Sequence, residues 1–337
     1  MKIAMLAPIA WRTPPRHYGP WELVTSLLTE ELVKMGLDVT LFATGDSVTR
    51  ARLKSVCAQG YEEDPETDAK VAECLHISNC MEQSAGFDII HNQFDFLPLT
   101  YSRFISTPMV TTIHGFSSPR IIPVYQKYNA HNYYVSISFS NRHPSLQYIG
   151  NVYHGIDLNE FYFEGNPSAG YLLFMGRIHP DKGAHDAIKI ARKAGIKLIL
   201  AGIVQDEDYF ENEVRPYLND STVRFIGSTG GAQKIKLMQN ALALLHPISF
   251  EEPFGLSVVE SMACGTPVIA YRKGSMPELI EDGKTGFLVT DADMAVEAVK
   301  KIARIDRTNC RKIVSERFSS EIMARNYLAI YRKILDR

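Results

Sequence analysis

Two glutamates of this chain stand close enough in sequence to share one site. Glu252 and Glu260 are separated by seven residues, most of them apolar. The pattern after Gly255 predicts a helix that ends at Gly265 and leads into a short buried strand. The beginning of such a helix exposes free backbone N–H groups and a partial positive charge, which favour phosphate. Carboxylates on both sides of that position suit a diphosphate ligand with hydroxyl groups at both ends, such as a nucleotide-sugar.

Two basic residues follow a second predicted strand. A buried run at residues 172–176 ends at a glycine, and Arg177 and Lys182 lie in the loop that follows. Ligands bind at the carboxyl ends of the strands in an open parallel sheet. The guanidinium group offers a planar fork and the ammonium group a point charge, so together they can neutralise a departing diphosphate.

Two further segments complete the pattern. Residues 110–115 form a β-branched strand that ends at His114, and residues 18–22 place Gly19 just before a predicted helix. With these segments the chain resembles the retaining, GT-B-fold glycosyltransferases of family 4 (glycosyl transferases group 1) over nearly its whole length. Related enzymes usually have a second glycine where this chain has Pro20, so the close approach of backbone to donor rests on Gly19 alone. Proline at this position preserves the start of the helix.

The resemblance implies a role for each of these residues. Arg177 and Lys182 would bind the diphosphate of the donor. Glu252 would bind hydroxyl groups of the sugar, and Glu260 would accept hydrogen bonds from the ribose diol. His114 would lie beside the transferred sugar. The predicted catalytic residues are therefore His114, Arg177, Lys182 and Glu252.

The resemblance also places the two substrates. The nucleobase would lie near Ile203 and the glycine-rich loop at residues 227–231, where backbone groups would read it. The predicted donor-binding residues are Gly19, Arg177, Lys182, Ile203, Gly227, Glu252, Phe254, Gly255, Leu256 and Glu260. The predicted acceptor-side residues are Trp11, His17, Tyr18, Phe94 and Phe116. UDP-glucose is the first choice of donor and GDP-mannose the second, while the acceptor stays open as a small molecule, a glycan or a lipid-linked hydroxyl.

Short apolar runs rich in valine, isoleucine, leucine and threonine alternate with helical stretches along the chain. Such alternation predicts an α/β protein with parallel sheets covered by helices on both faces. By resemblance the architecture is GT-B, with two Rossmann-like, doubly wound domains that face a cleft. The expected divisions are an acceptor-side domain at 1–155, a linker at 156–170, a donor domain at 171–318 and a terminal helix at 319–337 that packs back on the first domain.

Charge and composition exclude several classes of partner. The 337 residues contain 36 Lys and Arg against 38 Asp and Glu, so neither nucleic acid nor an anionic membrane is expected as the main partner. No run reaches the roughly 18 apolar residues that span a membrane. The five cysteines are odd in number and lack a Cys-x-x-Cys pair, which indicates reduced thiols. We therefore expect a cytoplasmic protein, with room for peripheral contact at the inner face of the membrane.

Several alternatives compete with this interpretation. Asp206 and Asp208, and likewise Asp291 and Asp293, match the Asp-x-Asp of metal-dependent transferases with the GT-A fold. We nevertheless expect neither a metal nor another cofactor, because basic side chains already serve the diphosphate. A GT-B enzyme with another reaction, such as a glycan phosphorylase or a nucleotide-sugar epimerase, is one alternative, and a catalytically silent sugar- or nucleotide-binding protein is another. The sequence indicates no oligomeric state.

Overall fold

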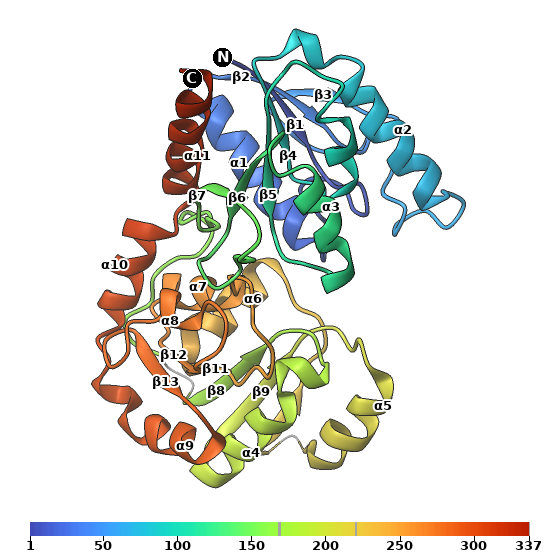
Figure 1. The fold of residues 1–337 in the computed structure, drawn as a ribbon. Helices are drawn as coiled ribbons and strands as arrows, with labels where there is room; N and C mark the ends of the chain where they lie inside the picture. The colour runs from blue at the N-terminus through green and yellow to red at the C-terminus, as the bar shows by residue number, and fades with distance from the viewer. Residues whose placement is uncertain (168–169, 220, 337) are drawn as a thin grey trace. The chain divides into compact units, whose positions relative to one another are not determined.

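The chain folds as two compact units (Figure 1). The structure, a computed structural model, describes residues 1–167, 170–219 and 221–336. Unit 1 consists of Met1–Gly155 and the C-terminal segment that begins at Ser320, and unit 2 consists of Ile156–Ser319. Residues 168–169 of the predicted linker and residue 337 of the predicted terminal helix lie outside the described residues.

Most of the segment predicted as a linker is part of unit 2. Phe161 is buried. Arg311 donates from Nη2 to the carbonyl oxygen of Leu158 at 3.0 Å, and Arg307 donates from Nε to the carbonyl oxygen of Glu164 at 2.9 Å. These bonds attach the described part of the segment to the helix at residues 307–317 of the same unit.

Unit 1 is built on a sheet of seven strands in the order β3-β2-β1-β4-β5-β6-β7. Every neighbouring pair is parallel, and chain order reverses between β1 and β4, as in a doubly wound sheet. The strands are β1 (Lys2–Leu6), β2 (Asp38–Phe42), β3 (Arg52–Lys54), β4 (Ile89–Asn92), β5 (Met109–Ile113), β6 (Tyr133–Ser136) and β7 (Tyr148–Asn151). The helices are α1 (Pro20–Lys34), α2 (Ala69–Met81), α3 (Ile122–Lys127) and α11 (Ser320–Leu335), with 3-10 turns η1 (Ser84–Gly86), η2 (Leu97–Tyr101) and η3 (Pro119–Ile121).

Unit 2 repeats this plan with six parallel strands in the order β10-β9-β8-β11-β12-β13. The strands are β8 (Tyr171–Met175), β9 (Lys197–Ala201), β10 (Val223–Phe225), β11 (Ala241–His246), β12 (Val268–Tyr271) and β13 (Gly286–Val289). The helices are α4 (Ala184–Ala194), α5 (Glu207–Tyr209), α6 (Gly231–Asn240), α7 (Leu256–Ala263), α8 (Met276–Leu279), α9 (Ala292–Lys301) and α10 (Arg307–Arg317). Short turns are η4 (Pro180–Lys182), η5 (Phe210–Val214), η6 (Arg215–Tyr217) and η7 (Ile302–Arg304). Chain order reverses between β8 and β11, and ligands bind at the carboxyl ends of strands at such a point.

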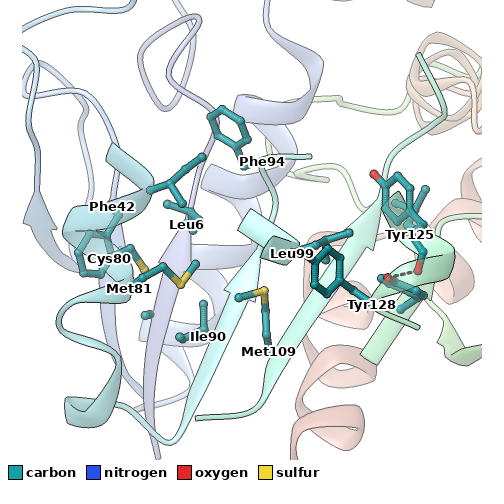
Figure 2. Close-up of a cluster of buried hydrophobic side chains, with 14 of the residues drawn as sticks. Leu6, Phe42, Cys80, Met81, Ile90, Phe94, Leu99, Met109, Tyr125 and Tyr128 are labelled. Atoms are coloured by element: carbon teal, nitrogen blue, oxygen red, sulfur yellow. Dashed lines mark hydrogen bonds between the residues drawn. The ribbon is translucent and has the colours of Figure 1, made fainter. Parts of the chain in front are cut away.

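The core of unit 1 explains why its central strands are buried and rich in apolar and β-branched residues. All five residues of β5 and four of the five in β1 are buried, as expected for parallel strands covered on both faces. Figure 2 shows how side chains from β1, α2, β4 and β5 pack together, including Leu6, Met81, Ile90 and Met109. Phe94, predicted on the acceptor side, belongs to this cluster and is 6% exposed.

The C-terminal helix α11 returns to unit 1, as predicted. It contacts α1, and Tyr331 Oη lies 2.5 Å from Nδ1 of His91 on β4. The five cysteines are all free. Among the described residues, no helix has both the length and the apolar character needed to cross a membrane.

Candidate functional site

The backbone around Glu252 is fixed by the segment that follows β12. Ser275 N donates to the carbonyl oxygen of Glu252 at 3.0 Å, and Ser275 Oγ donates to that of Phe254. A Cβ atom on Gly274 would lie 2.3 Å from Glu252 N, and Gly274 has φ +52°, so only glycine fits there. The loop between β11 and α7 is therefore held in one conformation, and Glu252 with it.

Lys182 meets Glu252 at the point where chain order reverses. Ser249 N donates to the carbonyl oxygen of Asp181 at 2.9 Å, which joins the loop after β11 to the loop after β8. Lys182 Nζ forms a charged hydrogen bond with Glu252 Oε2. The two side chains are 15% and 13% exposed, so the pair is largely shielded from water. The structure thus brings together two predicted catalytic residues that are far apart in sequence.

His246, at the carboxyl end of β11, belongs to the same group. Its Nε2 lies 3.8 Å from Glu252 Oε2 and has no hydrogen-bond partner in the described part of the chain. Burial, with a further contribution from the charge of Lys182, lowers its pKa to about 3, so the ring is neutral. The sequence analysis missed this residue. A histidine at the end of an apolar run, six positions before Glu252, was the available signal.

The start of α7 lies directly after this loop. Gly255 caps the helix, and Val258 N donates to its carbonyl oxygen at 3.1 Å. The N–H groups that precede Val258 in this turn have no acceptor within the helix, as at the start of any α-helix. Phe254 is 2% exposed, so only its backbone can contact a ligand, whereas Leu256 is half-buried.

Glu260 lies inside α7 and already has a cationic partner. Its side chain is 4% exposed, and Lys234 Nζ of α6 lies 2.7 Å from its Oε1. Lys234 also lies 5.5 Å from the centre of the Phe161 ring. The sequence analysis missed Lys234, which no motif marks. A ribose diol that bound Glu260 would share the carboxylate with this lysine.

The remaining donor-side residues lie at the carboxyl ends of β8, β9 and β10. Arg177 donates from Nη1 to Gln205 Oε1. Ile178 N donates to the carbonyl oxygen of Ile203 at 2.8 Å, and the Ile203 side chain is 37% exposed. Gly202 N donates to the carbonyl oxygen of Gly227 at 2.9 Å. These residues therefore lie at the same edge of the sheet as Lys182 and Glu252.

In unit 1, Gly19 allows a close approach between a loop and the first turn of α1. Gly19 has φ +150°, and a Cβ atom there would lie 2.9 Å from Glu22 Oε2. The Glu22 carboxylate accepts a hydrogen bond from Trp11 N at 3.4 Å and is 3% exposed. Burial raises the pKa of Glu22 to about 7, although its backbone hydrogen bonds act in the opposite direction. His17 and Tyr18, by contrast, are exposed.

His114 uses both ring nitrogens within unit 1. Its Nε2 lies 2.7 Å from Gln93 Oε1, and its Nδ1 lies 3.3 Å from His154 Nε2. The Trp21 ring stacks on it with centres 5.0 Å apart and planes 18° apart. Burial, together with the neighbouring histidines, lowers the pKa of His114 well below its usual value, so the ring is neutral. Its contact with a sugar stays a prediction. Phe116 packs edge-on against Tyr125.

In each of the two acidic pairs that resemble a metal motif, the first aspartate caps a helix. Asp206 caps α5 by accepting from Tyr209 N at 2.9 Å, and Asp291 caps α9 by accepting from Met294 N at 2.8 Å. Within residues 1–167, 170–219 and 221–336, no group of three or more His, Cys, Asp or Glu is arranged to hold a metal ion.

Comparison with known proteins finds a family model that resembles unit 2. Residues 161–317 match the family model for glycosyl transferases group 1. This match spans nearly all of unit 2, which is Ile156–Ser319. The match includes Arg177, Lys182, Glu252 and Glu260, so this part of the predicted donor site lies within the family region.

Among curated relatives, a trehalose synthase of Pyrococcus horikoshii is 36% identical over 149 residues, which cover 41% of this chain and 36% of that protein. An N-acetyl-alpha-D-glucosaminyl L-malate synthase of Bacillus anthracis is 33% identical, with 49% and 45% covered. An uncharacterized glycosyltransferase of Methanocaldococcus jannaschii is 25% identical, with 96% and 98% covered. The chain spans less than half the length of the first curated relatives that it matches.

Solved structures match the whole chain. A sucrose-phosphate synthase of Thermosynechococcus elongatus has a TM-score of 0.79 at 20% identity and covers 100% of this chain and 99% of its own. AviGT4, a glycosyltransferase involved in avilamycin A biosynthesis, has a TM-score of 0.73 at 23% identity, with 100% and 98% covered. HepE of Anabaena in complex with UDP has a TM-score of 0.74 at 20% identity, with 99% and 100% covered. The predicted fold class, GT-B with two Rossmann-like units, is confirmed.

Proposed function

We propose that the chain is a retaining, metal-independent glycosyltransferase that moves a hexose from a nucleotide-sugar to an acceptor hydroxyl. The observation that carries the proposal is the contact between Lys182 and Glu252 beside the start of α7, where chain order reverses in a unit that matches this family model. UDP-glucose is our first choice of donor, because HepE was solved with UDP and with UDP-glucose. GDP-mannose is the second choice. The acceptor is a small molecule, a glycan or a lipid-linked hydroxyl.

The proposed reaction requires unit 2 to stabilise a leaving diphosphate. Cleavage of the sugar–phosphate bond places negative charge on the diphosphate oxygens. Arg177, Lys182 and the free N–H groups at the start of α7 would stabilise that charge, which is usually the largest catalytic contribution. Because these groups are cationic or carry partial positive charge, no divalent ion is needed at the diphosphate.

Glu252 and Glu260 would each bind a different part of the donor. Glu252 would bind hydroxyl groups of the sugar, which gains positive charge as the bond breaks. Glu260 would bind the ribose diol while keeping its ion pair with Lys234. His114 and Gly19 of unit 1 keep the roles predicted for them. His114 would lie beside the transferred sugar, and the protein backbone at Gly19 would closely approach the donor.

A thermal-shift panel tests the proposal at the level of binding. UDP, UDP-glucose, GDP and GDP-mannose are each added at rising concentration to the wild-type chain and to Lys182→Met. A ligand at 100 times its dissociation constant stabilises the folded state by roughly 2.7 kcal/mol, which a melting curve resolves. We expect one nucleotide family to raise the melting temperature of the wild type and to act more weakly on the variant.

Turnover then separates an enzyme from a silent binding protein. The bound donor is incubated with acceptor mixtures, and proton NMR follows the anomeric signals of donor and product. We expect release of a nucleoside diphosphate and a product with the anomeric configuration of the donor. No melting shift with any of the four ligands, or binding without turnover across the acceptor mixtures, would overturn the proposal.

A further inference from the structure

A chain of buried hydrogen bonds in unit 1 connects α11 with His114. His91 Nδ1 lies 2.5 Å from Tyr331 Oη, and His91 Nε2 lies 3.1 Å from Gln93 Nε2. The other end of the same amide, Gln93 Oε1, lies 2.7 Å from His114 Nε2. His91 and Gln93 are fully buried, so water does not replace these contacts. The chain therefore links the C-terminal helix to β4 and to the carboxyl end of β5.

The Gln93 amide sets the direction of these bonds, because its nitrogen can only donate and its oxygen can only accept. His91 Nε2 must accept, so the proton of that ring sits on Nδ1 and is donated to Tyr331. His114 must carry its proton on Nε2, which leaves His114 Nδ1 as an acceptor. Both rings are neutral, since burial lowers the pKa of His91 to about 3 and that of His114 well below its usual value.

The hydrogen bonds of Thr112 and His154 are consistent with these directions. Thr112 Oγ1 lies 2.8 Å from His91 Nε2 and 2.7 Å from Tyr327 Oη, so it donates to His91 and accepts from Tyr327. His154 donates from Nε2 to His114 Nδ1 at 3.3 Å. This contact is longer than the 2.7 Å bond to Gln93, so a ligand hydroxyl would replace it more readily.

We propose that Gln93, His91 and Tyr331 are positioning residues that hold His114 in its Nε2-protonated form, so that His114 Nδ1 accepts a hydrogen bond from a ligand hydroxyl. The hydroxyl must donate in this arrangement. A ligand with fluorine in place of that hydroxyl loses the bond, because fluorine cannot donate. The assignment of the ligand as a donor sugar rests on the proposed function, whereas the proton position on His114 does not.

NMR of the ring nitrogens tests the proton positions without any substrate. Protein labelled with ¹⁵N-histidine is measured by two-bond ¹H–¹⁵N correlation at pH 7.5, and the His114 and His91 signals are assigned by their absence in His114→Gln and His91→Gln. We expect the Nε2–H form for His114 and the Nδ1–H form for His91. The Nδ1–H form of His114 in the wild type would overturn the proposal.

Two matched tyrosine variants test whether α11 controls His114. Tyr331→Phe removes the acceptor of His91 Nδ1–H, and a buried donor without a partner is costly. If that proton moves to His91 Nε2, the Gln93 amide must rotate so that its oxygen accepts from His91. The amide nitrogen then donates to His114 Nε2, which leaves His114 protonated on Nδ1. We therefore expect the Nδ1–H form of His114 to appear in Tyr331→Phe. Tyr327→Phe removes only a donor to Thr112, so the His114 signals should stay as in the wild type. Unchanged His114 signals in Tyr331→Phe would contradict the proposal.

A substrate experiment extends the test to the proposed enzyme. Singly deoxyfluorinated forms of the donor sugar are compared with the parent donor by kcat/KM in the wild type and in Tyr331→Phe. We expect fluorination at one position to lower kcat/KM by about five- to tenfold in the wild type. That penalty should shrink in Tyr331→Phe, because His114 Nδ1 then donates and fluorine can weakly accept. An equal penalty in both proteins overturns the control by α11, while absence of turnover counts against the proposed function and leaves the NMR result standing.

Discussion

Replacing Glu252 by glutamine should tighten the binding of a free nucleoside diphosphate while it slows turnover. The ammonium group of Lys182 is paired with the Glu252 carboxylate. A diphosphate that binds Lys182 must compete with that carboxylate and lie near its negative charge. Glutamine keeps the shape and a hydrogen-bond acceptor but removes the charge, so Lys182 becomes available. Turnover should still fall, because a carboxylate near the sugar is needed most in the transition state.

The burial of the pair sets the size of the effect. Unit charges 4 Å apart interact by about 4 kcal/mol at an effective dielectric constant of 20, whereas fully exposed pairs contribute about 0–1 kcal/mol. Lys182 and Glu252 are 15% and 13% exposed, which places them between these limits. Rotation of the lysine side chain toward the ligand recovers part of the interaction. We expect a gain of about 1–3 kcal/mol, or about 5- to 150-fold in the dissociation constant for UDP or GDP.

Isothermal titration of the bare nucleotide into three proteins measures this directly. Glu251→Gln is the matched control, because it removes the same charge one residue earlier from an exposed side chain that accepts from Gly274 N. Its affinity should stay within about twofold of the wild type, since an exposed charge contributes little. Weaker or unchanged binding in Glu252→Gln would refute the reasoning, and equal tightening in both variants would attribute the effect to overall charge rather than to the ion pair.

Three further predictions address other parts of the account. Glu260→Ala should weaken UDP or GDP binding by about 1–3 kcal/mol, because the ribose diol loses a charged acceptor, and unchanged calorimetric affinity would exclude that role. Glu22 has its pKa raised to about 7, so its ionisation destabilises the folded state as pH rises from 4.5 to 7, and Glu22→Gln should gain up to roughly 3 kcal/mol in urea unfolding at pH 8 but almost nothing at pH 4. A pH-independent difference would contradict this. Activity should survive EDTA, whereas loss of activity that Mn²⁺ or Mg²⁺ restores would implicate Asp206 and Asp208.

Periodicity and motif spacing were sufficient to predict the alternating fold, because central parallel strands such as β1 and β5 are buried on both faces and consist mainly of apolar and β-branched residues. The edge strands of unit 1 carry no such signal. β3 (Arg52–Lys54) is three residues long with exposed ends, and β7 (Tyr148–Asn151) is half-buried throughout, so neither stands out in the sequence. The helix expected after Gly19 is α1, which begins at Pro20.

The candidate site likewise contains some residues that the sequence identifies and others that only the structure identifies. Residues that follow strands within a recognisable motif, such as Lys182 and Glu252, could be named from the sequence. Lys234, which pairs with Glu260, and His246, which lies near Glu252, could not be named, because they act through tertiary contacts that no local pattern encodes. The sequence assigns Glu252 only to the sugar, and the ion pair with Lys182 is what connects its charge to the affinity for free UDP.

Acceptor-dependent release of nucleoside diphosphate tests the central claim most directly. ³¹P NMR follows UDP-glucose, and then GDP-mannose, with an acceptor mixture in the presence of EDTA, for the wild type and for Arg177→Ala combined with Lys182→Ala. The account predicts conversion of one donor to its nucleoside diphosphate by the wild type, dependent on acceptor, and loss of this conversion in the double variant. Conversion that persists in the double variant, or no conversion of either donor by the wild type, would contradict it.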